Sequence, residues 1–354
     1  MTEGTYRGKP RVTAASIAVH TGLSRATVTH VLNGHADEQR IRRETQQKVL
    51  EAARLLGYRP NASARALHTG KTGTAALIQS LSAAYLPERL LLGLTEALSE
   101  NNMYLTLAEV PDAVLDDRSY LPKILREHTV DGLIINRIVD IPDSFIEEVN
   151  RLNTPVTFLN VNRPWDAVYP DDFNGGRMAA NYLIGLGHTR ILYLGSYVNC
   201  PLHYSQIDRR DGYREAMFQA GLQQRELLLP ADPPTHIEAL NDKRVQVMRT
   251  YLENTPYRPT AIVAYELAEA LAVLHAAHQL QLRIPQDLSL AMFHHHMDFR
   301  LCVPVTTFCN GMHIVGREAV SLLLQKIDTP GVLVPSRMVP IELIEGATCS
   351  PPTG

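Results

Sequence analysis

Residues 13–34, TAASIAVHTGLSRATVTHVLNG, constrain the fold of this chain more than any other stretch. They predict a short helix, a turn at Gly22 and a second helix that stops at Asn33-Gly34. Only glycine adopts a backbone with positive φ at little cost in conformational energy, so Gly22 should end the first helix. The Ser24 hydroxyl then stands where it can cap the second helix. The stretch therefore predicts two short helices joined by a tight turn.

The two faces of the predicted second helix differ in polarity. Val28 and Leu32 lie four residues apart on one face, whereas Arg25 and Thr29 lie off it. Two helices joined by a turn of about three residues form a motif whose second member enters the DNA major groove. Arg25 is the strongest candidate base reader, because a guanidinium can bond two acceptors of a guanine edge. An ordinary αα-hairpin with a solvated arginine is the alternative.

The charge of the chain is divided unevenly. Residues 1–70 carry 11 Lys and Arg against 5 Asp and Glu, a net charge of +6, and the remainder carries −9. A basic N-terminal segment on an otherwise acidic chain implies that a polyanionic partner binds residues 1–70 alone. The four cysteines show no CxxC pair, and neither a signal peptide nor a membrane span is visible, so we expect a cytoplasmic protein without a membrane partner.

From Thr74 onward, short apolar runs alternate with helical stretches, which predicts parallel sheets covered by helices. A dinucleotide-binding enzyme would share this pattern, but no GxGxxG follows any predicted strand. Gly70-Lys71-Thr72 resembles the end of a phosphate-binding loop, yet Arg65 stands where that loop needs glycine. Neither a Ser/His/Asp order nor a pair of carboxylates with recognisable spacing stands near the predicted strand ends. We therefore expect that the protein is not an enzyme and has no cofactor.

Ligand pockets in such sheets lie beyond the carboxyl ends of the strands. Asn136, Asn160, Tyr265 and His294 each fall at or just past such an end, which makes them candidate ligand contacts. The run His294-His295-His296 also suggests a metal, but three consecutive histidines on an extended chain point alternately. At most two would face one way, so we expect loop histidines and no metal site.

Two long segments resemble the lac repressor family of bacterial transcription regulators. VTAASIAVHTGLSRATVTHVLNG and KVLEAARLLGYRPNASARALHTGKTGTAALI are similar to that family's headpiece, hinge helix and first core strand, and a looser resemblance continues to about residue 345. The resemblance implies an all-α helix-turn-helix headpiece and an α/β core of two parallel-sheet subdomains, periplasmic-binding-protein-like type I. The implied ranges are 1–58 for the headpiece, 59–72 for the hinge helix and linker, 73–346 for the core (N-subdomain 73–165 and 304–332, C-subdomain 166–303 and 333–346) and 347–354 for a tail.

The resemblance also implies which residues contact DNA. Arg25, Ala26 and His30 would face bases, and His30 stands where the family commonly has arginine. Leu67 matches an apolar wedge that enters the minor groove, and Arg42 replaces a serine that commonly caps the third helix. The full set of expected DNA contacts is Thr13, Ser24, Arg25, Ala26, Thr29, His30, Asn33, Arg42, Tyr58, Asn61, Leu67 and His68.

For the small-molecule effector, the resemblance implies contacts in the cleft of the core. The expected effector contacts are Leu86, Leu90, Asn136, Asn160, Arg209, Tyr265, His294 and Asn310. The chain has Tyr265-Glu266 where the family commonly has Asn-Asp, and His294-His295 where it commonly has Asp-Asp. Histidine can donate hydrogen bonds and, when protonated, favours an anion. These departures favour an effector that is acidic, phosphorylated or aromatic, or a pocket that has lost its usual ligand. The expected partner is a small molecule such as a sugar, sugar acid or phosphorylated sugar.

We expect a homodimer that acts as a transcriptional repressor on a pseudo-palindromic operator, because two-fold protein symmetry matches paired half-sites. Whether the effector induces or corepresses stays open. The end of the chain shows no heptads, which argues against a coiled-coil tetramer. A nucleoid-type architectural protein and a solute-binding protein with the same core fold are the alternatives.

Overall fold

A computed structural model describes residues 12–59, 66, 70–80, 86–111, 129–136, 143–151, 153–197, 203–230, 242–296 and 303–353. The chain divides into two compact units, Met1–Gly73 and Thr74–Gly354. The expected DNA contacts Asn61, Leu67 and His68 lie outside the described residues. Within the described part of the chain, no helix combines the length and the apolar composition needed to cross a membrane.

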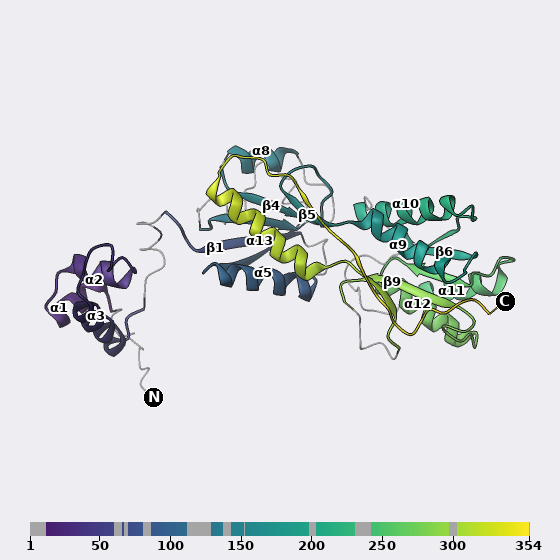
Figure 1. The fold of residues 1–354 in the computed structure, drawn as a ribbon, viewed down its shortest axis with the longest axis horizontal. Helices are drawn as coiled ribbons and strands as arrows, with labels where there is room; N and C mark the ends of the chain where they lie inside the picture. Colours follow the sequence, from purple (N-terminus) through teal and green to yellow (C-terminus); the bar gives the residue numbers. More distant parts are fainter. Residues whose placement is uncertain are drawn as a thin grey trace, which may run out of the picture. The chain divides into compact units, whose positions relative to one another are not determined.

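The first unit contains the helices α1 (Ala14–Thr21), α2 (Arg25–Leu32) and α3 (Arg43–Leu56) (Figure 1). The three helices pack around one small apolar core. Ile17, Val28 and Val49 supply one fully buried side chain from each helix. Gly22 ends α1 with φ +69°, as the sequence predicts. The helix-turn-helix arrangement expected from residues 13–34 is confirmed.

The second unit contains two sheets, each with six strands within the described residues (Figure 1). The first has the order β11-β5-β4-β3-β1-β2 and is parallel throughout. The second has the order β12-β10-β9-β8-β6-β7 and is parallel except for β12. The strands are β1 (Thr74–Ser80), β2 (Tyr104–Val110), β3 (Gly132–Asn136), β4 (Val156–Leu159), β5 (Ala167–Pro170), β6 (Ile191–Tyr197), β7 (Glu226–Pro230), β8 (Ala261–Ala264), β9 (Ser289–His294), β10 (Thr306–Cys309), β11 (Arg337–Val339) and β12 (Glu342–Ile344).

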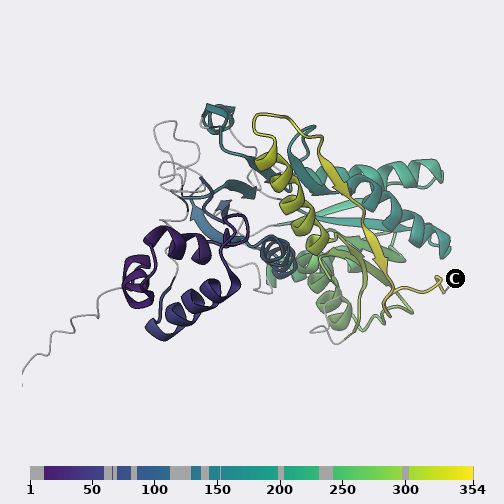
Figure 2. The ribbon, with the colours of Figure 1, turned by 60° about the vertical axis from the view of Figure 1, so that its left-hand side comes forward.

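Helices cover both faces of each sheet, as Figures 1 and 2 show. One face of the first sheet packs against α5 and α13 and the other against α8, so that neighbouring residues such as Leu77 and Ile78 enter different clusters. In the second sheet α11 and α12 lie on one face, and α9 and α10 on the other. These helices are α5 (Glu88–Glu100), α8 (Asp143–Arg151), α9 (Asp172–Gly185), α10 (Tyr204–Gln219), α11 (Asp242–Asn254), α12 (Leu267–Gln279) and α13 (Met312–Asp328).

Glycines allow two helix pairs to cross with their backbones in contact. A Cβ atom added at Gly176 of α9 would overlap the carbonyl oxygen of Arg209 on α10, and one added at Gly212 would overlap that of Phe173. Gly93 of α5 and Gly316 of α13 form a similar crossing on the first sheet. Each subdomain therefore has one helix pair whose spacing depends on the absence of side chains.

The chain passes between the two sheets three times within the described residues. It leaves the first sheet after β5, returns between β10 and α13, and leaves again between β11 and β12. These crossings fall near residues 171, 310 and 340, whereas the expected subdomain boundaries were 166, 304 and 333. The strands at the crossings have only three or four residues, which is too short for a hydrophobic period to show.

Residues 346–353, most of them expected to be a tail, pack against the second sheet. Thr348 has 0% of its surface exposed, and its hydroxyl accepts from the N–H of Thr306 (2.9 Å) and donates to the carbonyl of Leu290 (2.6 Å). The carbonyl of Ser350 accepts a hydrogen bond from the buried His188 imidazole (2.9 Å). The segment thus forms part of the second subdomain.

Candidate functional site

The candidate DNA-reading surface is the polar face of α2. Arg25 and Ala26 are exposed in its first turn, and His30 is half-buried one turn later. The Ser24 hydroxyl accepts from the N–H of Thr27 at 3.0 Å and so caps the helix as predicted. The first turn of α2 thus presents an arginine beside free backbone N–H groups, an arrangement that suits an anionic partner.

Three of the expected DNA contacts already make hydrogen bonds within the headpiece. Thr13 forms a capping box with Ser16 at the start of α1. Ser24 caps α2, and the hydroxyl of Thr29 donates to the carbonyl of Arg25 at 2.8 Å. Their DNA contacts stay predictions, and the structure adds a capping role for Thr13.

The other expected DNA contacts among the described residues lie at helix ends. Asn33 is the exposed C-cap residue of α2, and Tyr58 packs half-buried against the headpiece core. Arg42 precedes α3 and makes no side-chain cap, as expected from the missing serine. Gln46 holds the preceding loop instead, by donating to the carbonyl of Ile41 (2.8 Å). Arg42 is exposed and free to reach a phosphate.

The candidate effector site lies at the carboxyl ends of the strands of both sheets. Asn136 is the last residue of β3, and Asn160 follows β4 with φ +54°, a conformation that asparagine tolerates. The amide Nδ2 of Asn160 donates to Oδ1 of Asn136 at 3.1 Å. The Asn160 Oδ1 atom is buried and has no hydrogen-bond partner among the described residues. The two predicted amides therefore lie side by side, with one acceptor left over.

Contacts between the two subdomains meet at these amides. The imidazole Nε2 of His203, directly before α10, donates to the carbonyl of Asn160 at 2.9 Å. Its Nδ1 accepts from Ser205, whose hydroxyl also bonds the Tyr265 hydroxyl at 2.8 Å. Burial lowers the pKa of His203, which keeps its ring neutral. A polar chain thus runs from the first subdomain to Tyr265, a predicted contact just past β8.

Arg209 of α10 lies beside Tyr265 and forms a buried ion pair with Asp172. Only 3% of its surface is exposed, and its Nε donates to Oδ1 of Asp172 at 2.6 Å. Its Nη1 donates to the carbonyl of Tyr265 (3.0 Å), and its guanidinium covers the rings of Tyr265 and Phe293. The carboxylate raises the pKa of Arg209 despite its burial, so the side chain stays charged. Arg209 is therefore no surface charge, and its effector contact stays a prediction.

The remaining predicted effector contacts divide between the strand ends and the core. His294 ends β9 and Asn310 follows β10, and the Asn310 Oδ1 atom is buried without a hydrogen-bond partner among the described residues. Leu90 is fully buried in the core between α5 and the first sheet, and Leu86 packs against the same cluster. Leu90 thus packs in the hydrophobic core, because helix periodicity turns it toward the sheet, and its contact with an effector stays a prediction.

The three consecutive histidines do not alternate. β9 ends at His294, and His295 and His296 follow in a bend. One nitrogen from each ring lies within 4.8 Å of the other two. The expectation that at most two of them face one way is therefore wrong, because it assumed extended backbone through all three.

Sequence reasoning missed several polar residues of this region. Asp172, which pairs with Arg209, is one of them, and Glu269 is another. The Ser196 hydroxyl donates to the carboxylate of Glu269, and Arg244 lies 3.5 Å from it. Burial raises the pKa of Glu269. Asp171-Asp172 directly after an apolar run was the available signal for Asp172, whereas Glu269 sits within a helix and gave none.

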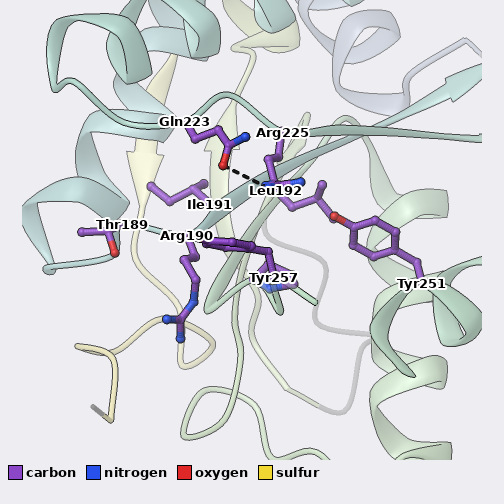
Figure 3. Close-up of a pocket in the computed structure, with 9 residues that line it drawn as sticks. Thr189, Arg190, Ile191, Leu192, Gln223, Arg225, Tyr251 and Tyr257 are labelled. Atoms are coloured by element: carbon purple, nitrogen blue, oxygen red, sulfur yellow. Dashed lines mark hydrogen bonds between the residues drawn. The ribbon is translucent and has the colours of Figure 1, made fainter. Parts of the chain in front are cut away.

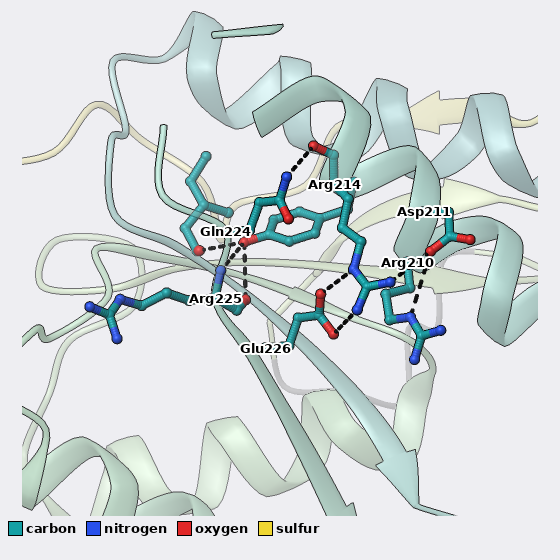
Figure 4. A network of polar contacts seen from close by, with 8 residues as sticks. Arg210, Asp211, Arg214, Gln224, Arg225 and Glu226 are labelled. Carbon is teal, nitrogen blue, oxygen red and sulfur yellow. Dashed lines mark hydrogen bonds and ion pairs between the residues drawn. The ribbon is translucent and has the colours of Figure 1, made fainter. Parts of the chain in front are cut away.

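The far end of α10 is anchored at the amino ends of the strands (Figure 4). Arg214 bonds Glu226 at the start of β7 (Nη2 to Oε2, 3.0 Å), and its carbonyl accepts from Gln224 (3.1 Å). The Tyr213 hydroxyl donates to the carbonyl of Ile191 (2.9 Å) and accepts from the N–H of Arg225 (3.0 Å). Burial raises the pKa of Tyr213 to about 12. These contacts fix the helix that carries Arg209.

A small pocket lies at the same amino-terminal end of the second sheet (Figure 3). Its polar side chains make structural contacts: Arg190 Nε donates to the carbonyl of Arg258 (3.0 Å), and the Arg225 guanidinium lies 4.8 Å from the ring centre of Tyr257. Because ligands of parallel sheets bind at the carboxyl ends of the strands, this pocket is the weaker candidate for a binding site.

Comparison with known proteins agrees with this architecture. Residues 14–61 match the family described as bacterial regulatory proteins, lacI family, and residues 180–349 match the periplasmic binding protein-like domain. The HTH-type transcriptional regulator AglR of Rhizobium meliloti (strain 1021) is 29% identical, over 96% of this chain and 95% of AglR. The regulator CelR of Thermobifida fusca is 29% identical, over 93% of this chain and 95% of CelR.

Solved structures share the fold along nearly the whole chain. The lac repressor dimer bound to operator and the anti-inducer ONPF superposes with a TM-score of 0.78 at 22% identity, covering 96% of this chain and 99% of that one. The complex of the regulator CelR with cellobiose gives a TM-score of 0.62 at 24% identity, covering 96% and 100%.

A helix-turn-helix unit joined to a two-sheet core defines a DNA-binding transcriptional regulator. The matched segments and the full-length relatives place the chain in that class. Its residues 14–61 match the lacI family of bacterial regulatory proteins, and HTH-type transcriptional regulators are similar to it along nearly the whole chain.

Proposed function

We propose that two copies of this chain bind a pseudo-palindromic operator in the cytoplasm as a repressor, and that a neutral sugar bound at the carboxyl ends of the core strands changes the affinity for DNA. Dimerisation is supported by exposed apolar side chains on the first sheet and its helices, at Leu92, Tyr104, Leu107 and Ile314. The lac repressor structure, which is a dimer on its operator, supports the same arrangement.

Base reading by Arg25 is testable by titration of labelled DNA. Arg25→Ala should weaken binding to the selected operator by roughly 5- to 150-fold, since one bidentate contact to guanine contributes about 1–3 kcal/mol. Arg54→Ala is the matched control, because Arg54 is an exposed arginine in the last turn of α3. Equal affinity for operator and random DNA at one salt concentration would instead indicate an architectural DNA-binding protein.

The observation that supports a neutral sugar is the set of buried acceptors at the strand ends. Asn160 Oδ1 and Asn310 Oδ1 have no hydrogen-bond partner among the described residues, and sugar hydroxyls can donate to both. Arg209 offers little attraction to an anion, because Asp172 neutralises it. The complex of CelR with cellobiose supports the same ligand class. A sugar acid or sugar phosphate is therefore the weaker candidate.

A thermal-shift screen of neutral sugars, sugar acids, sugar phosphates and purines tests this proposal, since a ligand of the folded core raises its apparent stability. We expect neutral sugars to give the largest shift. Asn160→Asp keeps the backbone conformation but adds charge and loses a donor, so it should weaken sugar binding by about tenfold. Asn254→Asp, at the exposed end of α11, is the control. A largest shift with an anionic ligand would contradict the proposal.

A further inference from the structure

We propose that His294, His295 and His296 form a binding site for a divalent transition-metal ion of the zinc type. The three side chains converge at the carboxyl end of β9. Their ring centres lie 3.9 Å apart for His294 and His295, 4.5 Å for His295 and His296, and 5.1 Å for His294 and His296. One nitrogen of each ring lies within 4.8 Å of the other two.

The backbone explains why three neighbours in sequence can face one point. β9 ends at His294, and the following bend breaks the alternation of a strand. Backbone hydrogen bonds hold the segment against β10, because the carbonyl of His294 accepts from the N–H of Asn310 (3.0 Å), and that of His295 from the Cys309 thiol (3.3 Å). The cluster is therefore held at the carboxyl end of β9, an interior strand of the second sheet.

The chemistry of the cluster suits a metal better than it suits packing alone. Only 7% of His295 is exposed, and Nδ1 of His296 is buried with no hydrogen-bond partner among the described residues. A buried nitrogen without a partner is costly, and coordination to a cation would satisfy its lone pair. Imidazole nitrogens are preferred ligands of Zn²⁺, Ni²⁺ and Cu²⁺.

The distances are compatible with one ion after small side-chain rotations. Zn–N bonds of about 2.0–2.1 Å in tetrahedral geometry place the ligand nitrogens roughly 3.3 Å apart. The nitrogens already lie within 4.8 Å of one another, so each pair has to approach by at most about 1.5 Å, and the imidazoles have two rotatable bonds each, χ1 and χ2, for that adjustment. Three protein ligands leave a fourth position open to water or to an oxygen atom of a bound molecule.

The test is metal binding by the full, untagged chain, which does not require DNA or effector. Chelator-treated protein is titrated with Zn²⁺ in competition with a chromophoric chelator, and with Co²⁺ while its visible absorption is followed. We expect one ion per chain, and His296→Ala should weaken its binding at least tenfold. His278→Ala, which removes an exposed histidine of α12, should leave it unchanged.

His296→Gln provides a second variant in case the alanine variant does not fold, since glutamine keeps a polar side chain of similar length. Circular dichroism confirms the fold of each variant before titration. Stoichiometric binding lost in both His296 variants supports the site. Absence of stoichiometric binding, or binding that the His296 variants leave unchanged, overturns it. Neither result bears on operator binding, so the regulatory proposal is tested separately.

Discussion

The pairing of Arg209 with Asp172 gives the most decisive stability prediction. Both side chains are almost fully buried, and the Nε–Oδ1 distance is 2.6 Å. Asp172→Asn keeps the shape of the side chain but leaves the arginine charge without its counterion. Removing one partner of a buried ion pair costs about 3–5 kcal/mol. The asparagine oxygen can still accept from Nε, so the loss should lie near the lower limit, about 3 kcal/mol.

The measurement is thermal and urea unfolding of the full chain. A loss of about 3 kcal/mol should lower the midpoint of the second unit by roughly 6–12 °C. The double variant Asp172→Leu, Arg209→Met should recover much of this loss, because apolar replacement of a whole buried pair is often neutral. Asp211→Asn, at a half-exposed ion pair with Arg214, should cost less than about 1 kcal/mol. A loss below about 1 kcal/mol for Asp172→Asn would refute the reasoning.

Three further predictions concern other parts of the core and are tested by unfolding. Gly212→Ala should destabilise it by about 1–3 kcal/mol through overlap with α9, whereas Gly185→Ala, with open space around its Cβ, should be neutral or stabilising. Thr348→Val should cost about 1–3 kcal/mol, because it leaves the buried N–H of Thr306 without its acceptor; an unchanged midpoint would mean that the segment is not part of the core. Burial lowers the pKa of the His188 imidazole below 6.5 in the folded state. As the pH falls, the unfolded state therefore takes up a proton at a higher pH than the folded state does, and the free energy of unfolding should decrease below about pH 6.5. His188→Gln should flatten that fall, and an unchanged pH profile would exclude His188 as its cause.

The parts of the fold that follow from local chemistry were predictable. Gly22 and Ser24 marked the ends of the first two helices because the turn needs positive φ and the helix needs a cap. Asn136 and Asn160 were placed at strand ends because long apolar runs in a parallel sheet end where polar residues begin. Their hydrogen bond to each other could not be predicted, since it depends on which strands are neighbours.

Other parts depend on contacts between distant segments and left no local signal. β11 has three residues, and its place beside β5 depends on a return of the chain after α13. The pairing of Arg209 with Asp172 depends on the glycine crossing of α9 and α10, which joins residues far apart in sequence. The convergence of the three histidines depends on the residue at which β9 ends, and strand ends are the least predictable feature of a sequence.

The repeated passage of the chain between the two sheets affects how the protein folds during synthesis. β5 forms early, but the strand that covers its free edge, β11, is made roughly 170 residues later. At about 5–20 residues per second, the ribosome needs on the order of ten to thirty seconds to supply it. During that time the nascent chain exposes an unpaired, apolar strand edge, the kind of surface that promotes aggregation and chaperone binding. The two sheets receive their last strands late and almost together, the first sheet with β11 and the second with β12, so the two subdomains should fold as one late, cooperative step.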